Sequence, residues 1–283
     1  MLAAGAGLAI ARFARAERSL VAPQRKLLFG TTPVFLDDQF RFLAKWSARL
    51  EDQLGQGVHF IQRGSYQEIT ELLLADQLDA AWVCGYPYVR HADRMKLLAV
   101  PQYKGNPLYR SYLIVPASDP SIANITQLSG RIFAYSDPQS NSGYLVPRTE
   151  LIRHGIDPRS FFGKAFFTFA HRKVVEAVTS GLASAGEIDG YVFDTLAKQS
   201  PEVVEGVRVA WQSPQYGFPP IVARRSLPLE VYARLQMALL TMTEDTGGRA
   251  LLEQLNLDRF VIGQDSLFDG IRGLVKLSDT IPT

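Results

Sequence analysis

Apolar and polar positions along the chain follow two periods, one typical of strands and one typical of helices. Short apolar runs predict buried strands at residues 26–29, 58–61, 80–83, 97–100, 112–115, 131–134, 165–169, 188–192 and 221–223. Apolar residues at helical spacing predict helices that begin near residue 37 and at 66–75, 143–154, 171–180, 229–243, 249–255 and 266–277. Strands that alternate with helices in this way predict βαβ units and an α/β fold.

One pattern of helix, turn and strand occurs twice. The helix YQEITELLL leads to Asp79 and the apolar run AAWV, and the helix HRKVVEAV leads to Asp189 and the run GYVF. All βαβ units share this general form, so the echo has an ordinary explanation. It is equally consistent with two similar lobes that face a cleft and present helix N-termini to it.

Length and composition restrict the class of protein. The 283 residues are enough for about two domains, and 47% hydrophobic with 20% charged residues is ordinary for a globular protein. A net charge of +2 is too balanced for a non-specific nucleic-acid binder, so no nucleic-acid partner is expected. The one cysteine, Cys84, excludes a disulfide framework and a cysteine-based metal site. We expect no metal and no cofactor.

The N-terminal segment 1–16, MLAAGAGLAIARFARA, resembles a secretory signal of atypical form. Its apolar run is too short to span a membrane, and Ala14-Arg15-Ala16 fits a cleavage site. A basic region ahead of the run is missing, because the first positive residue is Arg12. The segment is therefore read as a signal whose true start lies upstream, as a poor signal, or as a plain peripheral helix. Of these, we expect export to the periplasm.

Motifs for catalysis are missing from the sequence. It contains no G-x-S-x-G, H-E-x-x-H, P-loop or EF-hand pattern, and its four histidines have no metal-ligand spacing. We therefore do not expect an enzyme.

The segment DPQSNSGYLVP, which begins at Asp137, carries the clearest chemistry. It follows a predicted strand and opens a predicted helix, so free backbone N–H groups point out of the helix start. Ser140, Asn141 and Ser142 add side-chain donors, and Gly143 permits close approach to the backbone. Such donors at a helix N-terminus favour an anion. Serine and asparagine are also the usual helix caps, so the residues alone leave both interpretations open.

A family resemblance covers this segment and most of the chain. The run SDPQSNSGYLVPRTELIRHGIDPRSFF resembles the D-P-x-S-x-S-G-Y-x-x-P pattern of the PhnD-like family, the phosphate-, phosphite- and phosphonate-binding proteins of ABC importers. Further matches follow in chain order at residues 30–33, 65–66, 79–82, 85–88, 128–130, 171, 174–181, 189 and 213–220.

The resemblance implies a type 2 periplasmic-binding-protein fold, in which two lobes with mixed sheets are joined by two crossover strands. Lobe 1 is then expected at residues 25–115 plus 214–283, and lobe 2 at 116–213. The implied function is capture of a phosphorus oxyanion between the lobes for a membrane permease, by a monomer. Hinge closure would signal occupancy. The alternative is a ligand sensor of a signalling system with the same fold.

The resemblance also implies a set of ligand-binding residues: Ser140, Asn141, Ser142, Gly143, Tyr66, His171, Asp189, Tyr86 and Tyr88. His171 would pair with the oxyanion as an imidazolium. Tyr86 and Tyr88 either line the cleft or pack beside it. Asn141 stands where relatives often have threonine, but both side chains donate hydrogen bonds.

Two acidic residues, and one position at which the sequence differs from the family pattern, bear on the chemical class of the ligand. Asp189 would face an anion only if it accepted a proton from a P–OH group or met a ligand ammonium. Asp194 is a nearby rival, more simply interpreted as a helix cap. Arg172 stands where many relatives have glutamate, which removes a partner for an ammonium group. That departure argues against an aminoalkyl phosphonate.

Overall fold

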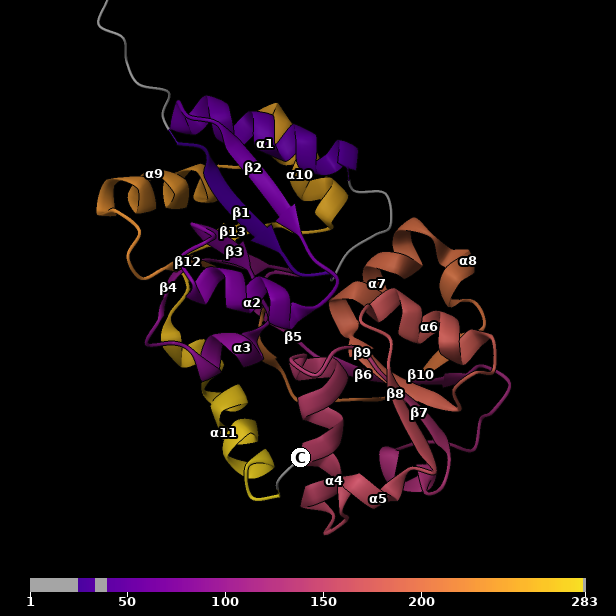
Figure 1. Ribbon diagram of the computed structural model, residues 1–283. Helices are drawn as coiled ribbons and strands as arrows, with labels where there is room; N and C mark the ends of the chain where they lie inside the picture. The colour runs from indigo at the N-terminus through magenta and orange to yellow at the C-terminus, as the bar shows by residue number, and fades with distance from the viewer. Residues whose placement is uncertain (1–24, 34–39, 282–283) are drawn as a thin grey trace, which may run out of the picture.

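Two β-sheets, each flanked by helices, form the body of the protein (Figure 1). The computed structural model describes residues 25–33 and 40–281, so the segment 1–16 lies outside the described residues. A third, two-stranded ladder of β5 (Leu108–Tyr109) and β11 (Tyr216–Gly217) lies between the two sheets in the chain path. The architecture is the two-lobed α/β fold expected from the sequence.

The first sheet has six strands in the order β13-β4-β12-β3-β1-β2. The strand β1 is parallel to β2 and β3, whereas β12 is antiparallel to β3 and β4. The strands are β1 (Leu27–Thr31), β2 (Val58–Gln62), β3 (Ala80–Trp82), β4 (Met95–Gln102), β12 (Ile221–Arg224) and β13 (Arg259–Val261).

Helices cover both faces of this sheet (Figure 1). One group of helices packs together above it: α1 (Phe40–Leu54), α9 (Leu229–Leu240) and α10 (Thr246–Leu255). The other face carries α2 (Tyr66–Leu74) and α3 (Gly85–Arg90), and the chain ends with η3 (Asp265–Phe268) and α11 (Asp269–Ser278). Between the layers, Trp46 packs against the rings of Phe29, Trp82 and Phe260.

The second sheet has five strands in the order β10-β6-β9-β7-β8. Its strands are β6 (Ser111–Pro116), β7 (Ile132–Tyr135), β8 (Lys164–Phe167), β9 (Ala185–Asp189) and β10 (Val207–Gln212). Its helices are η1 (Ile125–Leu128), the π-helix η2 (Asn141–Leu145), α4 (Val146–Arg153), α5 (Pro158–Phe161), α6 (His171–Thr179), α7 (Gly190–Gln199) and α8 (Pro201–Val204).

The pattern that occurs twice in the sequence corresponds to a structural repeat. The residues that are equivalent in the two copies differ from those that the sequence pattern paired. The strand triplets β2-β1-β3 and β8-β7-β9 have the same parallel order. Tyr66 and His171, the first residues of α2 and α6, are 105 positions apart. The same offset relates Gly85 and Gly190, where α3 and α7 begin. Asp79 and Asp189 are therefore not equivalent, because Asp79 precedes its strand and Asp189 ends one.

The strand predicted at residues 188–192 is wrong at its C-terminal half. The strand ends at Asp189, and Gly190 begins a helix that the apolar run Gly190–Phe193 did not reveal. The side chain of Asp189 accepts hydrogen bonds from the N–H groups of Tyr191 and Val192. This cap converts an apolar run with strand character into the first turn of α7.

One strand of the expected lobe 1 lies in the second sheet. The strand β6 pairs with β9 and β10 in the second sheet, although the prediction assigned residues up to 115 to lobe 1. The lobe limits remain a prediction, and we propose moving the first of them ahead of Ser111. The C-terminal helix α11 reaches from α3 to α4 of the other lobe, where Arg148 donates a hydrogen bond to Ser278.

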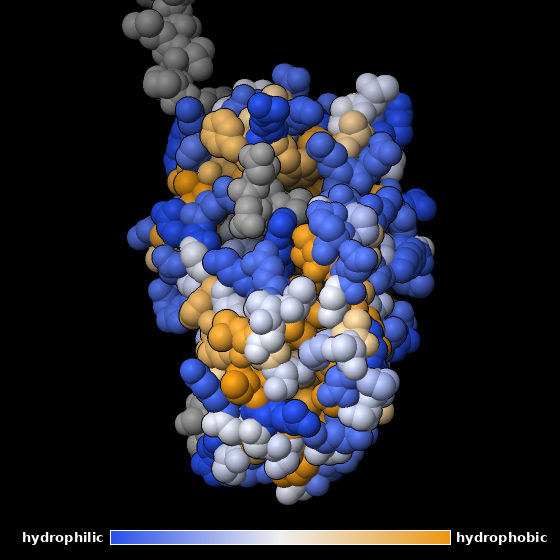
Figure 2. Space-filling view, turned by 90° about the vertical axis from the view of Figure 1, so that its right-hand side faces the viewer, coloured by the Kyte–Doolittle hydropathy of each residue, from blue (hydrophilic) through white to orange (hydrophobic). Residues whose placement is uncertain are grey.

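Within the described part of the chain, every helix is too short or too polar to cross a bilayer. On the face shown in Figure 2, hydrophilic residues surround several separate hydrophobic patches.

Candidate functional site

The loop at residues 137–143, which we call the 137–143 loop, follows the strand β7 of the second sheet and runs into η2. The backbone there winds in a π-turn, in which the Leu145 N–H donates to the Ser140 carbonyl at 3.0 Å. Ser140, Asn141 and Ser142 are all buried. π-Turns are rare and often occur at functional sites.

Ser140 is a helix cap in this structure. Its Oγ accepts a hydrogen bond from the Gly143 N–H at 2.9 Å, so this N–H is engaged within the loop. The cap leaves the Ser140 hydroxyl proton free to donate. The cap interpretation is therefore confirmed, and an anion-binding role for the same serine remains a prediction.

Gly143 is required by packing. A Cβ atom at this position would lie 1.9 Å from Ser136 Oγ and 3.0 Å from the Glu187 carbonyl oxygen. Any larger residue would therefore push the loop away from strands β7 and β9. The close approach that the glycine permits is that of Ser136 and the Glu187 backbone.

Residues of the first lobe cover the 137–143 loop. The Asn141 N–H donates to Cys84 Sγ at 3.2 Å, and the Asn141 side-chain amide donates to the Tyr109 hydroxyl at 2.9 Å. The Tyr66 N–H, at the N-terminus of α2, donates to the Asp137 carboxylate at 3.0 Å. These contacts join the two lobes at the loop, so the structure represents a closed arrangement.

His171 and Tyr66 meet across the lobes. The Tyr66 hydroxyl lies 3.2 Å from His171 Nε2, and both residues are buried. The Asp189 N–H donates to His171 Nδ1 at 3.2 Å. Because Nδ1 accepts, the proton of a neutral ring lies on Nε2 and is donated to the Tyr66 oxygen.

Burial opposes the imidazolium form expected for His171. Burial lowers the pKa of His171 to about 3, so the ring is neutral at physiological pH. A neutral ring offers a hydrogen-bond donor at Nε2 and no positive charge.

Asp189 lies beside His171 as the cap of α7. Burial raises its pKa to about 7, so the carboxyl group is close to half-protonated at neutral pH. A group in this state can accept a proton from a P–OH group or offer one to an oxyanion. A ligand-binding role for Asp189 remains a prediction.

Tyr86, Tyr88 and Asp194 make contacts away from the 137–143 loop. The Tyr88 hydroxyl donates to Asp265, and that of Tyr86 accepts a hydrogen bond from Arg90. A ligand-binding role for the two tyrosines remains a prediction. Asp194 is inside α7, so its interpretation as a cap is wrong; it accepts from Tyr103 and Lys104 at 3.0 and 2.7 Å.

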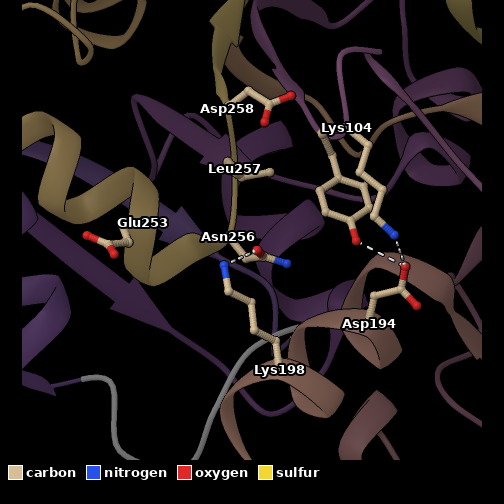
Figure 3. Close-up of a pocket in the computed structure, with 8 residues that line it drawn as sticks. Lys104, Asp194, Lys198, Glu253, Asn256, Leu257 and Asp258 are labelled. Atoms are coloured by element: carbon tan, nitrogen blue, oxygen red, sulfur yellow. Dashed lines mark hydrogen bonds and ion pairs between the residues drawn. The ribbon is translucent and has the colours of Figure 1, made fainter.

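The Asp194 contacts belong to a second seam between the lobes (Figure 3). A pocket of about 460 Å³ lies there, lined by Tyr103, Lys104, Asp194, Lys198, Glu253, Asn256, Leu257 and Asp258. Figure 3 shows the side chains of Lys104 and Asp194 directed at each other. Lys198 Nζ donates a hydrogen bond to the side-chain oxygen of Asn256, and the two atoms are 2.9 Å apart. Acidic and basic groups are mixed in this pocket, so it does not favour an anion.

Sequence reasoning assigned no ligand-site role to Asp137, Cys84 or Tyr109. In the sequence, Asp137 is the first residue of a motif and Cys84 is a lone thiol. Tyr109 lies in the two-residue strand β5, where no periodic pattern distinguishes it. The signal that could have found Cys84 is the 105-residue offset, which makes it the counterpart of Asp189.

Three buried polar atoms around the ends of β1 and β7 have no partner among the described residues. They are the hydroxyl oxygens of Thr31 and Ser136 and the side-chain oxygen of Asn141. Thr31 ends β1, and Ser136 immediately follows β7. Buried polar groups in native proteins almost always have a partner, which here would be a ligand or water.

A family model described as "ABC transporter, phosphonate, periplasmic substrate-binding protein" matches residues 29–268. The chain is 25% identical over 262 residues to the phosphonates-binding periplasmic protein of Escherichia coli, with 89% of this chain and 76% of that protein covered. It is 28% identical over 162 residues to the phosphate-import protein PhnD of Mycolicibacterium smegmatis, which covers 53% of this chain and 49% of the relative. The chain thus matches about half the length of that relative.

A solved structure shows the same fold. PhnD1 of Prochlorococcus marinus, in complex with methylphosphonate, has a TM-score of 0.81 at 22% identity and covers 90% of this chain and 98% of that one. The family model spans nearly the whole of both sheets, including the 137–143 loop and His171. The chain therefore belongs to the phosphonate-binding family of periplasmic substrate-binding proteins of ABC transporters.

Proposed function

We propose that this protein binds a phosphorus oxyanion between its lobes, at the 137–143 loop, and delivers it to an ABC permease. The observation that carries the proposal is the hydrogen-bond chain through His171. The Asp189 N–H donates to His171, and the His171 N–H donates to the Tyr66 oxygen. Among the described residues, the Tyr66 hydroxyl proton then has no acceptor. An oxyanion oxygen supplies one.

The donors around this proton are neutral and buried. Tyr66, His171 and the loop serines are each 2% exposed or less. Burial raises the pKa of Tyr66 well above its ordinary value, so its hydroxyl keeps its proton. Neutral donors in a dry site bind anions through directed hydrogen bonds, each worth about 1.5–3 kcal/mol when the acceptor is charged.

Asn141 can adapt to the anion. Its amide N–H₂ faces Tyr109, and its oxygen has no partner in the described chain. Rotation of the amide by 180° would turn its N–H₂ group to the site. The Tyr109 hydroxyl both donates and accepts, so that contact would be kept.

The ligand that the site favours is small. Tyr66, Asp137 and Asn141 already make direct contacts across the lobes, which leaves little space for a long organic chain. Arg172 pairs with Glu176 on the exposed side of α6, so the position that holds glutamate in many relatives carries a cation here. Phosphate, phosphite and methylphosphonate fit this description better than an aminoalkyl phosphonate.

Location and partners follow the family. Periplasmic location, a monomeric state and a permease partner are part of the proposal, as is the lack of catalytic activity. The named relatives are a phosphate-import protein, a phosphonates-binding protein and a methylphosphonate complex. Neither the site nor the family description favours the signalling alternative.

The test is calorimetry with phosphate, phosphite and methylphosphonate, and with sulfate as an anion of similar shape. We expect tight one-to-one binding of at least one phosphorus oxyanion. Tyr66→Phe should weaken it by about 10- to 100-fold, because one hydrogen bond to a charged group is lost.

The matched control is Tyr232→Phe. The Tyr232 hydroxyl donates to the Leu97 carbonyl on the far side of the first lobe, so its loss should leave affinity unchanged. No binding of any of the phosphorus anions, or equal affinities of wild type and Tyr66→Phe, would contradict the proposal.

A further inference from the structure

Glu187 is a buried carboxyl group below the 137–143 loop. It lies in the middle of strand β9, is 1% exposed and forms no ion pair with a described lysine or arginine. Its Oε1 lies 2.8 Å from the Ser111 hydroxyl, on the neighbouring strand β6. A carboxylate in this environment would be an uncompensated buried charge.

The Ser111 hydroxyl has two acceptors at the same distance. Ser111 Oγ is 2.8 Å from the Ser142 carbonyl oxygen and 2.8 Å from Glu187 Oε1. A hydroxyl carries one proton, so it can donate fully to only one of them. Both contacts are satisfied when Ser111 donates to the Ser142 carbonyl and Glu187 itself donates to Ser111.

We propose that Glu187 carries a proton at neutral pH and acts as a positioning residue, which anchors the 137–143 loop through Ser111 while placing no negative charge beneath the bound anion. Loss of this proton would turn the Ser111 hydroxyl toward Glu187, release the Ser142 carbonyl and add a like charge two hydrogen bonds from the loop. The protein would therefore bind its oxyanion less tightly at alkaline pH. This inference rests on the proposed function.

Burial supports the assignment, because it raises the pKa of Glu187 to about 8. The Ser111 hydrogen bond acts in the opposite direction, and Glu150 of α4 reinforces the rise. The other titratable groups that interact with Glu187 are Tyr135 of β7 and Tyr216 of β11. Both tyrosines have raised pKa values, so neither charges before Glu187 does.

The first measurement needs no ligand. The unfolding equilibrium of wild type and Glu187→Gln is followed in urea between pH 5 and 9. Glutamine is neutral and donates to Ser111 as the protonated carboxyl does. A folded state that holds a proton above the unfolded pKa loses stability as pH rises through that interval. The unfolding constant of wild type relative to Glu187→Gln should therefore rise by up to tenfold per pH unit and level off above pH 8.

Glu176→Gln is the control, because Glu176 is an exposed carboxyl on α6. Its unfolding constant should stay in a fixed ratio to that of wild type over the same range. A fixed ratio for Glu187→Gln as well would overturn the proposal, because it would mean that the buried carboxyl is already ionised.

The second measurement is calorimetry with phosphite at pH 7 and pH 9. The affinity of wild type relative to Glu187→Gln should fall by about tenfold between them, since like charges repel in a buried site. Ionisation of the ligand is common to both proteins and cancels in the ratio. Equal pH profiles would refute the link between Glu187 and the anion site.

The two measurements separate this inference from the proposed function. If no oxyanion binds to wild type, the proposed function fails, and the urea series still decides whether Glu187 holds a proton. If Glu187→Gln does not fold, wild type labelled with ¹³C at the glutamate carboxyl carbons replaces it. One signal should titrate near pH 8, and titration of every glutamate near its ordinary pKa would overturn the proposal.

Discussion

The two repeated units of this protein share a backbone but differ in chemistry. The unit α2-β3-α3 brings Tyr66, Trp82 and Cys84 to the positions that His171, Glu187 and Asp189 occupy in α6-β9-α7. The first set contains one hydroxyl, one indole and one thiol, whereas the second contains an imidazole and two carboxyl groups. The second unit thus carries the groups that titrate, and the first closes over them.

The difference shows that position and chemistry are separable in this fold. Each unit places its first helical residue at the same point, so Tyr66 and His171 meet at 3.2 Å. What each residue does there depends on its surroundings. Trp82 packs among rings and donates its N–H to the Pro219 carbonyl, while Glu187 is held by Ser111.

The largest expected effect concerns the apolar member of the pair Trp82 and Glu187. Trp82→Ala should lower the free energy of unfolding by about 3–5 kcal/mol, because a large buried side chain leaves a cavity beside Trp46 and Phe260. Urea unfolding measures this loss, and Trp82→Phe should lose less. A loss below about 1 kcal/mol for Trp82→Ala would show that the first lobe does not depend on this core.

The pair Cys84 and Asp189 allows a test of closure. Cys84 is the one cysteine of the chain, and its thiol is buried against the Asn141 N–H of the other lobe. Ligand at 100 times its Kd should favour the closed form by about 2.7 kcal/mol, which is about a hundredfold. Alkylation of Cys84 by iodoacetamide, followed by mass spectrometry, should slow accordingly.

The control for this experiment is sulfate, or whichever anion calorimetry finds not to bind. It should leave the alkylation rate unchanged. A rate that is equal with and without the bound oxyanion would mean that the lobes do not open around Cys84.

Of the pair Tyr66 and His171, the histidine should make the stability of the protein depend on pH in the acid range. Because burial lowers the pKa of His171 to about 3, the unfolded chain binds this proton below about pH 6.5 and the folded protein does not. His171 therefore makes stability fall as the pH drops from about 6.5 toward 3, by up to about 1.4 kcal/mol per pH unit. His171→Gln should remove this part of the pH dependence in urea unfolding.

Two variants check the assignment to His171. His154→Gln removes an exposed histidine and Tyr66→Phe removes the partner hydroxyl, and both should keep the acid dependence of wild type. If His171→Gln also keeps it, the ring is protonated in the folded state and the neutral-donor argument fails.

The smallest expected effect is the loss of a serine cap, which can be compared at Ser65 of α2 and Ser140 of η2. Each side chain accepts a backbone N–H, that of Glu68 or of Gly143. Replacement of either by alanine should cost about 1 kcal/mol of stability. Calorimetry should detect weaker oxyanion binding for Ser140→Ala alone, and equal affinities of the two variants would reduce Ser140 to a cap.

Much of the fold was predictable because it depends on local patterns. Apolar runs located most of the strands of both sheets, and helical spacing located α2, α4, α6 and α9. The prediction was wrong where local pattern and tertiary contacts disagree. Gly190–Phe193 has strand-like residues, yet the Asp189 cap and the end of the sheet make it helical. The helix α3 also was not predicted, because GYPYVR has no helical period.

The site was predictable only in part. The 137–143 loop and His171 were found through a motif, which preserves order along the chain. The residues that contact this motif lie far away in the sequence. Tyr66 donates a hydrogen bond to Asp137, which is 71 positions later, and Cys84 accepts one from Asn141, which is 57 positions later. No local pattern encodes such contacts, because they join segments that only the folded chain brings together.

By itself, the sequence determined the α/β class, the loop with its serine donors and the family to which the chain belongs. Only the tertiary structure decided the charge of the site. Burial lowers the pKa of His171 to about 3 and raises the pKa values of Asp189 and Glu187 to about 7 and about 8. Burial is a property of the packed chain, and the free energy of charging a group depends on the water that packing removes.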